Sequence, residues 1–300
     1  MARILITGGG GQLAKAFAAS KSNLEYISLP RARLDICKRC EVQRALDIFS
    51  PSVVVNTAAY TAVDQAEIRR AEAFSINRLG AELLAEECSR NNIPLIHIST
   101  DYVFDGRTEE EVDESFSVNP IGVYGLSKAE GEDGVRRKHS HHIILRVSSL
   151  FSGHSRCFPL AIIFAALKQK NICVVSDQVS GPTSAASVVS VVEVMLDQYL
   201  SGGRVPWGTY HFSQMPYVSW FDFARAVLHL ASVIDSRFAS VKLTPVSTEI
   251  YGARALRPMT SKLGTGKIRQ NFCLDPRLAL WENDLEVAIE EMFVSNQFLV

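Results

Sequence analysis

Residues 2–14 read ARILITGGGGQLA, a short apolar run followed by four glycines and the start of a helical pattern. Gly8, Gly11 and Ala14 match the spacing G-x-x-G-x-x-G/A. In this spacing, glycine lets the backbone turn tightly and lets a pyrophosphate approach the helix N-terminus, where free N–H groups and the helix dipole favour anions. A glycine-rich turn can also occur without a ligand. The strand expected before it and the helix expected after it favour dinucleotide binding.

The first half of the chain repeats this alternation of strand and helix. Apolar runs that predict strands lie at 4–7, 24–29, 53–56, 95–99 and 143–147. Helical patterns lie between them, at 12–20, 38–49, 66–90 and 124–138. Apolar strands that alternate with helices are typical of a parallel sheet buried on both faces. The sequence therefore predicts an α/β fold with a Rossmann-like, doubly wound parallel sheet.

After Val147 the alternation is looser. Further elements are expected near 160–168, 172–175, 185–200, 209–212, 220–230 and 275–292. We predict an NAD(P)-binding Rossmann domain at 1–148 and a smaller C-terminal substrate-binding lobe at 149–300, with part of 170–200 returning to the Rossmann sheet. A chain of 300 residues, 47% of them hydrophobic, is long enough to bury both cores.

Tyr124 and Lys128 lie four residues apart at the expected start of a helix. Residues at i and i+4 share a helix face, so one cofactor ribose could meet both side chains. A nearby ammonium is expected to lower the pKa of the phenol from about 10 toward neutral pH. Tyr124 would then be a proton donor to a carbonyl that receives hydride. This spacing is common by chance, and its weight comes from the glycine-rich turn upstream.

The end of the second expected strand bears on the choice of cofactor. An acidic side chain there would bind the 2′-hydroxyl of NAD, whereas an arginine accommodates the 2′-phosphate of NADP. Residues 28–31 read SLPR, with no acid at the strand tip. Arg31 therefore favours NADPH, with NADH possible.

Composition argues against several other classes of protein. The formal net charge is −1 and no basic run stands out, so we expect no nucleic-acid partner. No apolar stretch approaches the roughly 18 residues of a membrane span, and a strand that starts at Ala2 leaves no room for a signal peptide. The six cysteines are scattered, which favours reduced thiols. We therefore expect a cytoplasmic protein. We also expect no metal site, because Cys37-x-x-Cys40 has no second cysteine pair.

Several longer motifs together resemble one family. They are VVVNTAAYTAVD at 53–64, HISTDYVFDG at 97–106, YGLSK at 124–128, Asp177-Gln178 with Gly181-Pro182-Thr183, and Arg257-Pro258. From Ile4 to Phe293 the chain resembles the dTDP-4-dehydrorhamnose reductases, which are extended short-chain dehydrogenases/reductases. The resemblance implies NADPH-dependent reduction of the 4-keto group of a nucleotide-linked 6-deoxy sugar. The first expectation is conversion of dTDP-4-dehydro-L-rhamnose to dTDP-L-rhamnose, the last step toward that sugar nucleotide.

The resemblance also implies roles for individual residues. Tyr124 would be the acid, Lys128 would bind the nicotinamide ribose, and Thr100 would hydrogen-bond near the keto oxygen. The implied cofactor contacts, with Tyr124 and Lys128, are Gly8, Gly11, Gln12, Leu13, Arg31, Asp35, Ile36, Ala58, Ala59, Tyr60 and Thr61. The implied substrate contacts are Thr100, Asp101, Ser149 and Arg257. For Asp101, capping of a turn is an equally plausible role.

Two positions depart from the family pattern. Ser149 stands where the family commonly has a Trp that can stack on the nucleotide base, so recognition of the base is open. Phe151 either supplies the missing ring or simply packs in the core. Ala16 stands where some members carry a carboxylate of a metal-bridged dimer, so we expect a monomer or a weak homodimer.

Two other functions fit the same motifs. One is a reductase or epimerase of another nucleotide sugar. The other is a non-catalytic, NADP-binding regulatory subunit resembling that of methionine adenosyltransferase. The complete set of Thr100, Tyr124 and Lys128 favours an enzyme.

Overall fold

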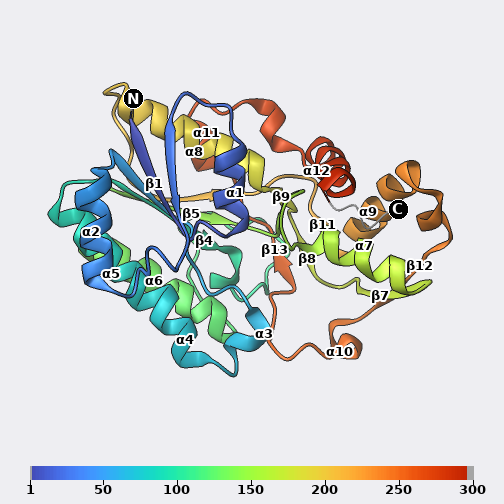
Figure 1. Cartoon of the computed structure of the whole chain (residues 1–300). Helices are drawn as coiled ribbons and strands as arrows, with labels where there is room; N and C mark the ends of the chain where they lie inside the picture. Colours follow the sequence, from blue (N-terminus) through green and yellow to red (C-terminus); the bar gives the residue numbers. More distant parts are fainter. Residues whose placement is uncertain (1, 296–300) are drawn as a thin grey trace.

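A six-stranded parallel sheet forms the centre of the computed structural model, which describes residues 2–295 (Figure 1). The strands are β1 (Arg3–Thr7), β2 (Glu25–Leu29), β3 (Val53–Asn56), β4 (Leu95–Thr100), β5 (His142–Val147) and β10 (Gly208–Phe212). Their order across the sheet is β10-β5-β4-β3-β1-β2. The order reverses between β1 and β3, and the loops after such strands are where a doubly wound sheet binds its ligand. The predicted fold class is confirmed.

Helices cover both faces of this sheet (Figure 1). On one face lie α1 (Gln12–Ala19) and α8 (Ala185–Leu200), and on the other α2 (Arg39–Phe49), α5 (Ala81–Arg90) and α6 (Val123–Lys138). Successive side chains of a strand point to opposite faces. Ile4 and Ile6 accordingly belong to the core under α1 and α8, whereas Leu5 belongs to the core under α2 and α5. Within residues 2–295, no helix has the length and apolarity needed to span a bilayer.

A second, separate core lies beside the carboxyl ends of the central strands. It is built mainly from helices α7 (Phe158–Lys168), α9 (Trp220–Ile234) and α12 (Glu282–Ser295). The short strands of this half are β6 (Leu150–Phe151), β7 (Asn171–Val175), β8 (Val179–Ser180), β9 (Thr183–Ser184), β11 (Val218–Ser219), β12 (Lys242–Val246) and β13 (Thr260–Ser261). The remaining elements are α10 (Thr248–Tyr251), α11 (Gly266–Asn271) and the short 3-10 turns η2 (Asp101–Val103), η3 (Ser236–Ser240) and η4 (Pro276–Ala279). Helix α8 and strand β10 pack with the central sheet, and the division at 148/149 stays a prediction.

The single helix expected over 66–90 is wrong. The structure has α3 (Val63–Ala66), α4 (Arg70–Phe74), a π-helix η1 (Ser75–Gly80) and then α5. The wider turn directs Asn77 toward the loop after β3, where its side chain bonds both the N–H and the carbonyl of Tyr60, at 2.8 and 3.1 Å. Gly80 lets the segment pass Ile36, since a Cβ there would lie 2.9 Å from Ile36 Cγ1. These are long-range contacts that helical periodicity does not encode.

Helix α6 packs against the segment after β4 at backbone distance. A Cβ on Gly125 would lie 2.1 Å from the carbonyl oxygen of Tyr102. We therefore expect Gly125→Ala to lower the free energy of unfolding by about 2–3 kcal/mol, because neither backbone can yield without moving its whole element. Gly266→Ala is the control, since a Cβ there meets no atom within 4 Å. Urea unfolding of both variants measures the difference, and equal stabilities would contradict the expectation.

Candidate active site

A pocket of about 300 Å³ lies at the ends of β1, β2 and β3, on the switch point of the sheet. The loops after these three strands supply most of its lining. It contains eight of the predicted cofactor residues, namely Gly8, Arg31, Asp35, Ile36, Ala58, Ala59, Tyr60 and Thr61. The fold therefore gathers residues that are far apart in the sequence into one cavity, with the guanidinium of Arg31 at its β2 side.

Gly8 determines how closely the loops after β1 and β3 approach each other. Its φ is +68°, and a Cβ there would lie 2.8 Å from Cα of Ala58. Gly11 is the N-cap of α1, and no side chain caps the helix there, so its first N–H groups are available to an anion. Gln12 and Leu13 do not line the 300 Å³ pocket. Gln12 accepts a hydrogen bond from Ser152, and Leu13 packs in the core.

The three predicted catalytic residues come from two adjacent elements. Thr100 ends β4, whereas Tyr124 and Lys128 lie in the first two turns of α6. Burial raises the pKa of Tyr124 to about 12, an effect that a hydrogen bond with Thr100 partly opposes. The expectation that the ammonium of Lys128 lowers the pKa of this phenol is wrong for the arrangement seen here. Tyr124 instead keeps its proton firmly at neutral pH.

Lys128 explains this difference. Its Nζ donates to the carbonyl of Ile98 at 2.7 Å and contacts His97 Nε2 at 3.4 Å, both on β4. The side chain is buried, and burial lowers its pKa to about 8. Lys128 directs its nitrogen at strand β4, and it is not among the groups that shift the pKa of the Tyr124 phenol.

A buried ion pair anchors helix α6 to the sheet. Glu132 accepts hydrogen bonds from Arg146 Nε and Nη2 at 2.9 and 2.7 Å, and from Arg136 Nη2 at 2.7 Å. Ser99 Oγ donates to the same carboxylate at 2.5 Å. Burial alone would raise the pKa of Glu132, but the hydrogen bonds and charge of Arg146 more than offset it and hold that pKa below its usual range. The ion pair therefore determines how far helix α6, and with it Tyr124 and Lys128, lies from the strand ends.

Asp101 lies within the same buried cluster as Thr100. It accepts hydrogen bonds from Thr100 Oγ1 at 3.0 Å and from Ser148 Oγ at 2.9 Å. Burial raises the pKa of its carboxyl despite these bonds. The side chain that caps the following turn is that of Thr100, which accepts from the N–H of Tyr102. The capping role considered for Asp101 is therefore wrong.

The other predicted substrate residues lie at the margin of that cluster, where Ser148 Oγ is 3.5 Å from Ser149 Oγ. Arg257 is half-buried and binds Asp64 of α3, with Nη2 to Oδ2 at 2.7 Å. Ser149 has a positive φ of 45° and donates to Ser180 Oγ at 2.7 Å. Phe151 is fully buried, with its ring 5.6 Å from that of Phe223, so it offers no surface to a nucleotide base. Of the two roles considered for Phe151, packing in the core is confirmed.

Sequence reasoning missed two side chains that hold the site together. Asn77 Nδ2 donates to Ser127 Oγ at 2.9 Å, which ties the Tyr60 loop to the helix that carries Lys128. His97 contacts Lys128 directly. A polar residue within an otherwise apolar strand was the available signal for His97, whereas nothing local distinguishes Asn77.

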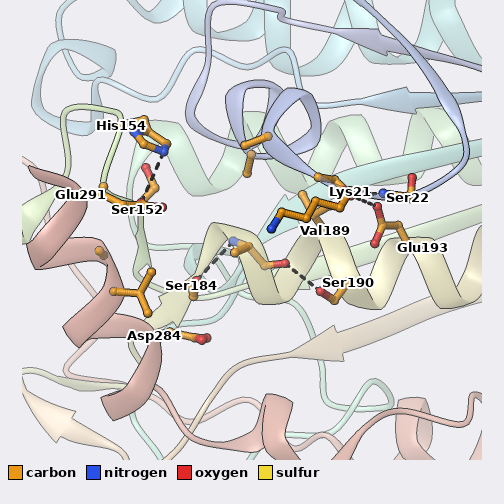
Figure 2. Close-up of a pocket in the computed structure, with 17 residues that line it drawn as sticks. Lys21, Ser22, Ser152, His154, Ser184, Val189, Ser190, Glu193, Asp284 and Glu291 are labelled. Carbon is orange, nitrogen blue, oxygen red and sulfur yellow. Dashed lines mark hydrogen bonds and ion pairs between the residues drawn. The ribbon is translucent and has the colours of Figure 1, made fainter. Parts of the chain in front are cut away.

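A second cavity of about 440 Å³ lies between α1, α8 and α12 (Figure 2). Its acidic side chains largely have partners, since Glu193 accepts from Tyr26 at 2.7 Å and Asp284 from Gln214 at 2.8 Å. Ala16 lines it without a ligand atom. In the described part of the chain, no group of three or more His, Cys, Asp or Glu side chains could hold a metal ion. This cavity shares no lining residue with the 300 Å³ pocket.

The chain is similar to known proteins over nearly its whole length. A family profile described as RmlD substrate binding domain matches residues 2–294. A dTDP-4-dehydrorhamnose reductase of Aggregatibacter actinomycetemcomitans is 39% identical over 92% of this chain and 95% of its own. The crystal structure of such a reductase from Clostridium acetobutylicum aligns with a TM-score of 0.87 at 32% identity, covering 96% of this chain and 98% of that one. Another, from Bacillus anthracis in complex with NADP, aligns with a TM-score of 0.85 at 33% identity, covering 99% and 100%.

Removing the charge of Glu132 tests the anchoring of helix α6. Glu132→Gln leaves the buried guanidinium of Arg146 without its counterion, so we expect the free energy of unfolding to fall by about 3–5 kcal/mol. Asp133→Asn is the matched control, because Asp133 is 62% exposed and pairs with Arg136 at the surface. Its effect should stay under about 1 kcal/mol. Chemical denaturation measures both, and a Glu132→Gln protein as stable as the control would contradict the role of the pair.

Proposed function

The chain belongs to the RmlD substrate binding domain family, which includes the dTDP-4-dehydrorhamnose reductases, and we propose that it catalyses their reaction. It is an NADPH-dependent oxidoreductase that reduces the 4-keto group of a nucleotide-linked 6-deoxy sugar. The substrate is dTDP-4-dehydro-L-rhamnose and the product dTDP-L-rhamnose. The observation that carries this proposal is the position of Thr100, Tyr124 and Lys128 at the strand ends beside the dinucleotide pocket.

The geometry supports a division of labour between cofactor and protein. Bound NADPH supplies the hydride, and the residues of the chain orient the keto sugar and manage its proton. Tyr124 holds a proton at neutral pH and donates it to the keto oxygen as negative charge develops there. Thr100 hydrogen-bonds the same oxygen and the phenol. An ammonium on Lys128 stabilises the tyrosinate that remains, and solvent then returns the proton.

The finer aspects of the proposal follow from particular residues. Arg31 at the pocket accounts for a preference for NADPH over NADH. A monomer or weak homodimer is proposed because Ala16 offers no metal ligand. A cytoplasmic location is proposed because all six cysteines are free thiols.

Oxidation of NADPH with a panel of nucleotide-linked 4-keto sugars tests the proposal. We expect turnover with dTDP-4-dehydro-L-rhamnose and little with the other sugars. An epimerase would convert its substrate without consuming NADPH, and a regulatory subunit would bind NADPH without any turnover. Either result would refute the reductase assignment.

Replacing the proton donor should separate chemistry from binding. We expect Tyr124→Phe to lower kcat on the order of a hundredfold or more, the usual contribution of a general acid. NADPH binding should persist, because the ring itself remains. Tyr251→Phe removes an exposed hydroxyl on α10 and serves as the control. Steady-state kinetics measure kcat, and fluorescence titration measures NADPH binding. A Tyr124→Phe enzyme that keeps most of its turnover would exclude Tyr124 as the proton donor.

Cofactor preference can be tested at Arg31. The guanidinium lies on the rim of the pocket and is held only by long contacts, 3.4 Å to Asp35 and 3.8 Å to Glu72. We expect Arg31→Ala to weaken NADPH binding by about 1.5–3 kcal/mol, the scale of a hydrogen bond to a charged group, and to leave NADH nearly unchanged.

Arg33→Ala is the control for this substitution, because Arg33 is equally exposed on the same loop but does not line the pocket. Dissociation constants for both cofactors give the answer. Parallel losses of NADPH and NADH affinity in Arg31→Ala would argue against contact with the 2′-phosphate.

A further inference from the structure

A row of polar side chains crosses the sheet under α2, α5 and α6, just before the strand ends. Thr7 of β1 pairs in register with Asn56 of β3, which pairs with His97 of β4. Two residues earlier, the same face carries the buried core residues of these strands, Leu5, Val54 and Leu95. All three polar side chains are at most 1% exposed. Such a row is costly inside a protein unless its members bond to one another.

The row is hydrogen-bonded throughout and ends at the catalytic lysine. Thr7 Oγ1 donates to Asn56 Oδ1 at 2.6 Å, and Asn56 Nδ2 lies 2.9 Å from His97 Nδ1. His97 Nε2 lies 3.4 Å from Lys128 Nζ, which also donates to the carbonyl of Ile98 at 2.7 Å. Thr7 and Asn56 directly precede the two loops that line the cofactor pocket. The row thus connects those loops to Lys128.

The backbone of Ala58 determines which ring nitrogen of His97 carries a proton. Its N–H lies 3.2 Å from Asn56 Oδ1 and 3.3 Å from Thr7 Oγ1, and its contact with Oδ1 favours the amide orientation in which the NH₂ group faces His97. His97 Nδ1 must then accept a hydrogen bond and cannot bear a proton. Burial is the largest cause that lowers the pKa of His97 well below its usual value, so the ring is neutral. Its single proton therefore lies on Nε2.

This tautomer directs an N–H group at the nitrogen of Lys128. An ammonium has no lone pair and cannot accept a hydrogen bond, whereas an uncharged amine can. We propose that His97 is a positioning residue that favours the uncharged amine of Lys128 on β4 at alkaline pH, through Nε2–H donated to Nζ. The rest of the inference depends on the proposed function. When an uncharged Lys128 turns to the cofactor ribose, its nitrogen takes up one proton from solvent and becomes the ammonium that Tyr124 requires.

The charged groups around Lys128 allow its nitrogen to change between amine and ammonium. Glu132 on α6 favours the ammonium, but its carboxylate is already bound by Arg136 and Arg146. The basic groups that act on the neighbouring imidazole are Arg136 of α6 and His142 of β5. Asp101, after β4, acts on the phenol of Tyr124 and is not among the groups that perturb Lys128. With the pKa of Lys128 lowered to about 8, both of its forms are accessible near neutral pH.

The tautomer of His97 can be measured directly in the wild-type protein. Long-range ¹H–¹⁵N spectra distinguish Nδ1–H, Nε2–H and doubly protonated imidazoles, and the spectrum of His97→Gln identifies the signal. We expect a neutral ring with its proton on Nε2 at pH 9, where Lys128 is mostly uncharged. A proton on Nδ1, or a charged ring, would overturn the proposal.

Proton uptake on cofactor binding tests the consequence. Binding of NADP⁺ to the Tyr124→Phe protein is followed by calorimetry in buffers of different ionisation enthalpy, so that no phenol contributes protons. Lys128 has a pKa of about 8 before binding and a higher one in the complex, so the complex holds more protons between these two values. Uptake should be small at pH 7 and approach one proton per site at pH 9. Binding without uptake at pH 9 would overturn the inference alone, whereas no binding of NADP⁺ would overturn the proposed function and the inference with it.

Two further variants are made in the same Tyr124→Phe background. Asn56→Asp should reverse the tautomer of His97, and Thr7→Val should preserve it. In Asn56→Asp the carboxylate accepts from His97 Nδ1–H, which leaves Nε2 free to accept from an ammonium, so uptake at pH 9 should disappear. Thr7→Val removes a hydroxyl from the same row but keeps the Ala58 N–H that orients Asn56, so uptake should persist. Full uptake in Asn56→Asp would contradict the role of His97. If Asn56→Asp does not fold, the spectra and the uptake by the parent protein decide the question.

Discussion

The close packing of helix α6 on the end of β4 is the constraint on which the site depends. A glycine at 125 lets the two backbones touch, and the buried pair of Glu132 and Arg146 holds the helix at that height. This contact places Tyr124 beside Thr100 and puts Lys128 within reach of the β4 backbone. A helix shifted outward by one side-chain layer would separate Tyr124 from Thr100 at the end of β4.

The cofactor side of the site follows from the topology of the sheet. Because the strand order reverses between β1 and β3, the loops after these strands diverge and leave a pocket between them. Gly8 then allows its loop to pass Ala58 at backbone distance. Asn77 fixes the far wall by binding both backbone groups of Tyr60, and it links that wall to Ser127 on α6. The pocket and the catalytic helix are therefore one hydrogen-bonded unit.

Burial gives Tyr124 and Lys128, the proposed catalytic groups, complementary properties. It raises the pKa of Tyr124, which keeps the proton that a donor must deliver, and it lowers the pKa of Lys128 toward neutral pH. A phenol that keeps its proton and a lysine whose nitrogen reaches the phenol only after it meets the ribose would concentrate tyrosinate stabilisation in the assembled complex. Stabilisation that arises only there favours the transition state over the free protein.

Local pattern determined the fold class, the glycine-rich turn and the pairing of Tyr124 with Lys128, because strand and helix periodicities and i,i+4 spacing are properties of neighbouring residues. The motifs around them also identified the family. Tertiary structure alone decided that the 66–90 helix is broken at a π-turn, that Phe151 is buried against Phe223, and that Lys128 faces His97 rather than Tyr124. Each of these depends on contacts between elements far apart in the chain. The contact of Asn56 Nδ2 with His97 Nδ1 at 2.9 Å is a further case, since it joins β3 to β4.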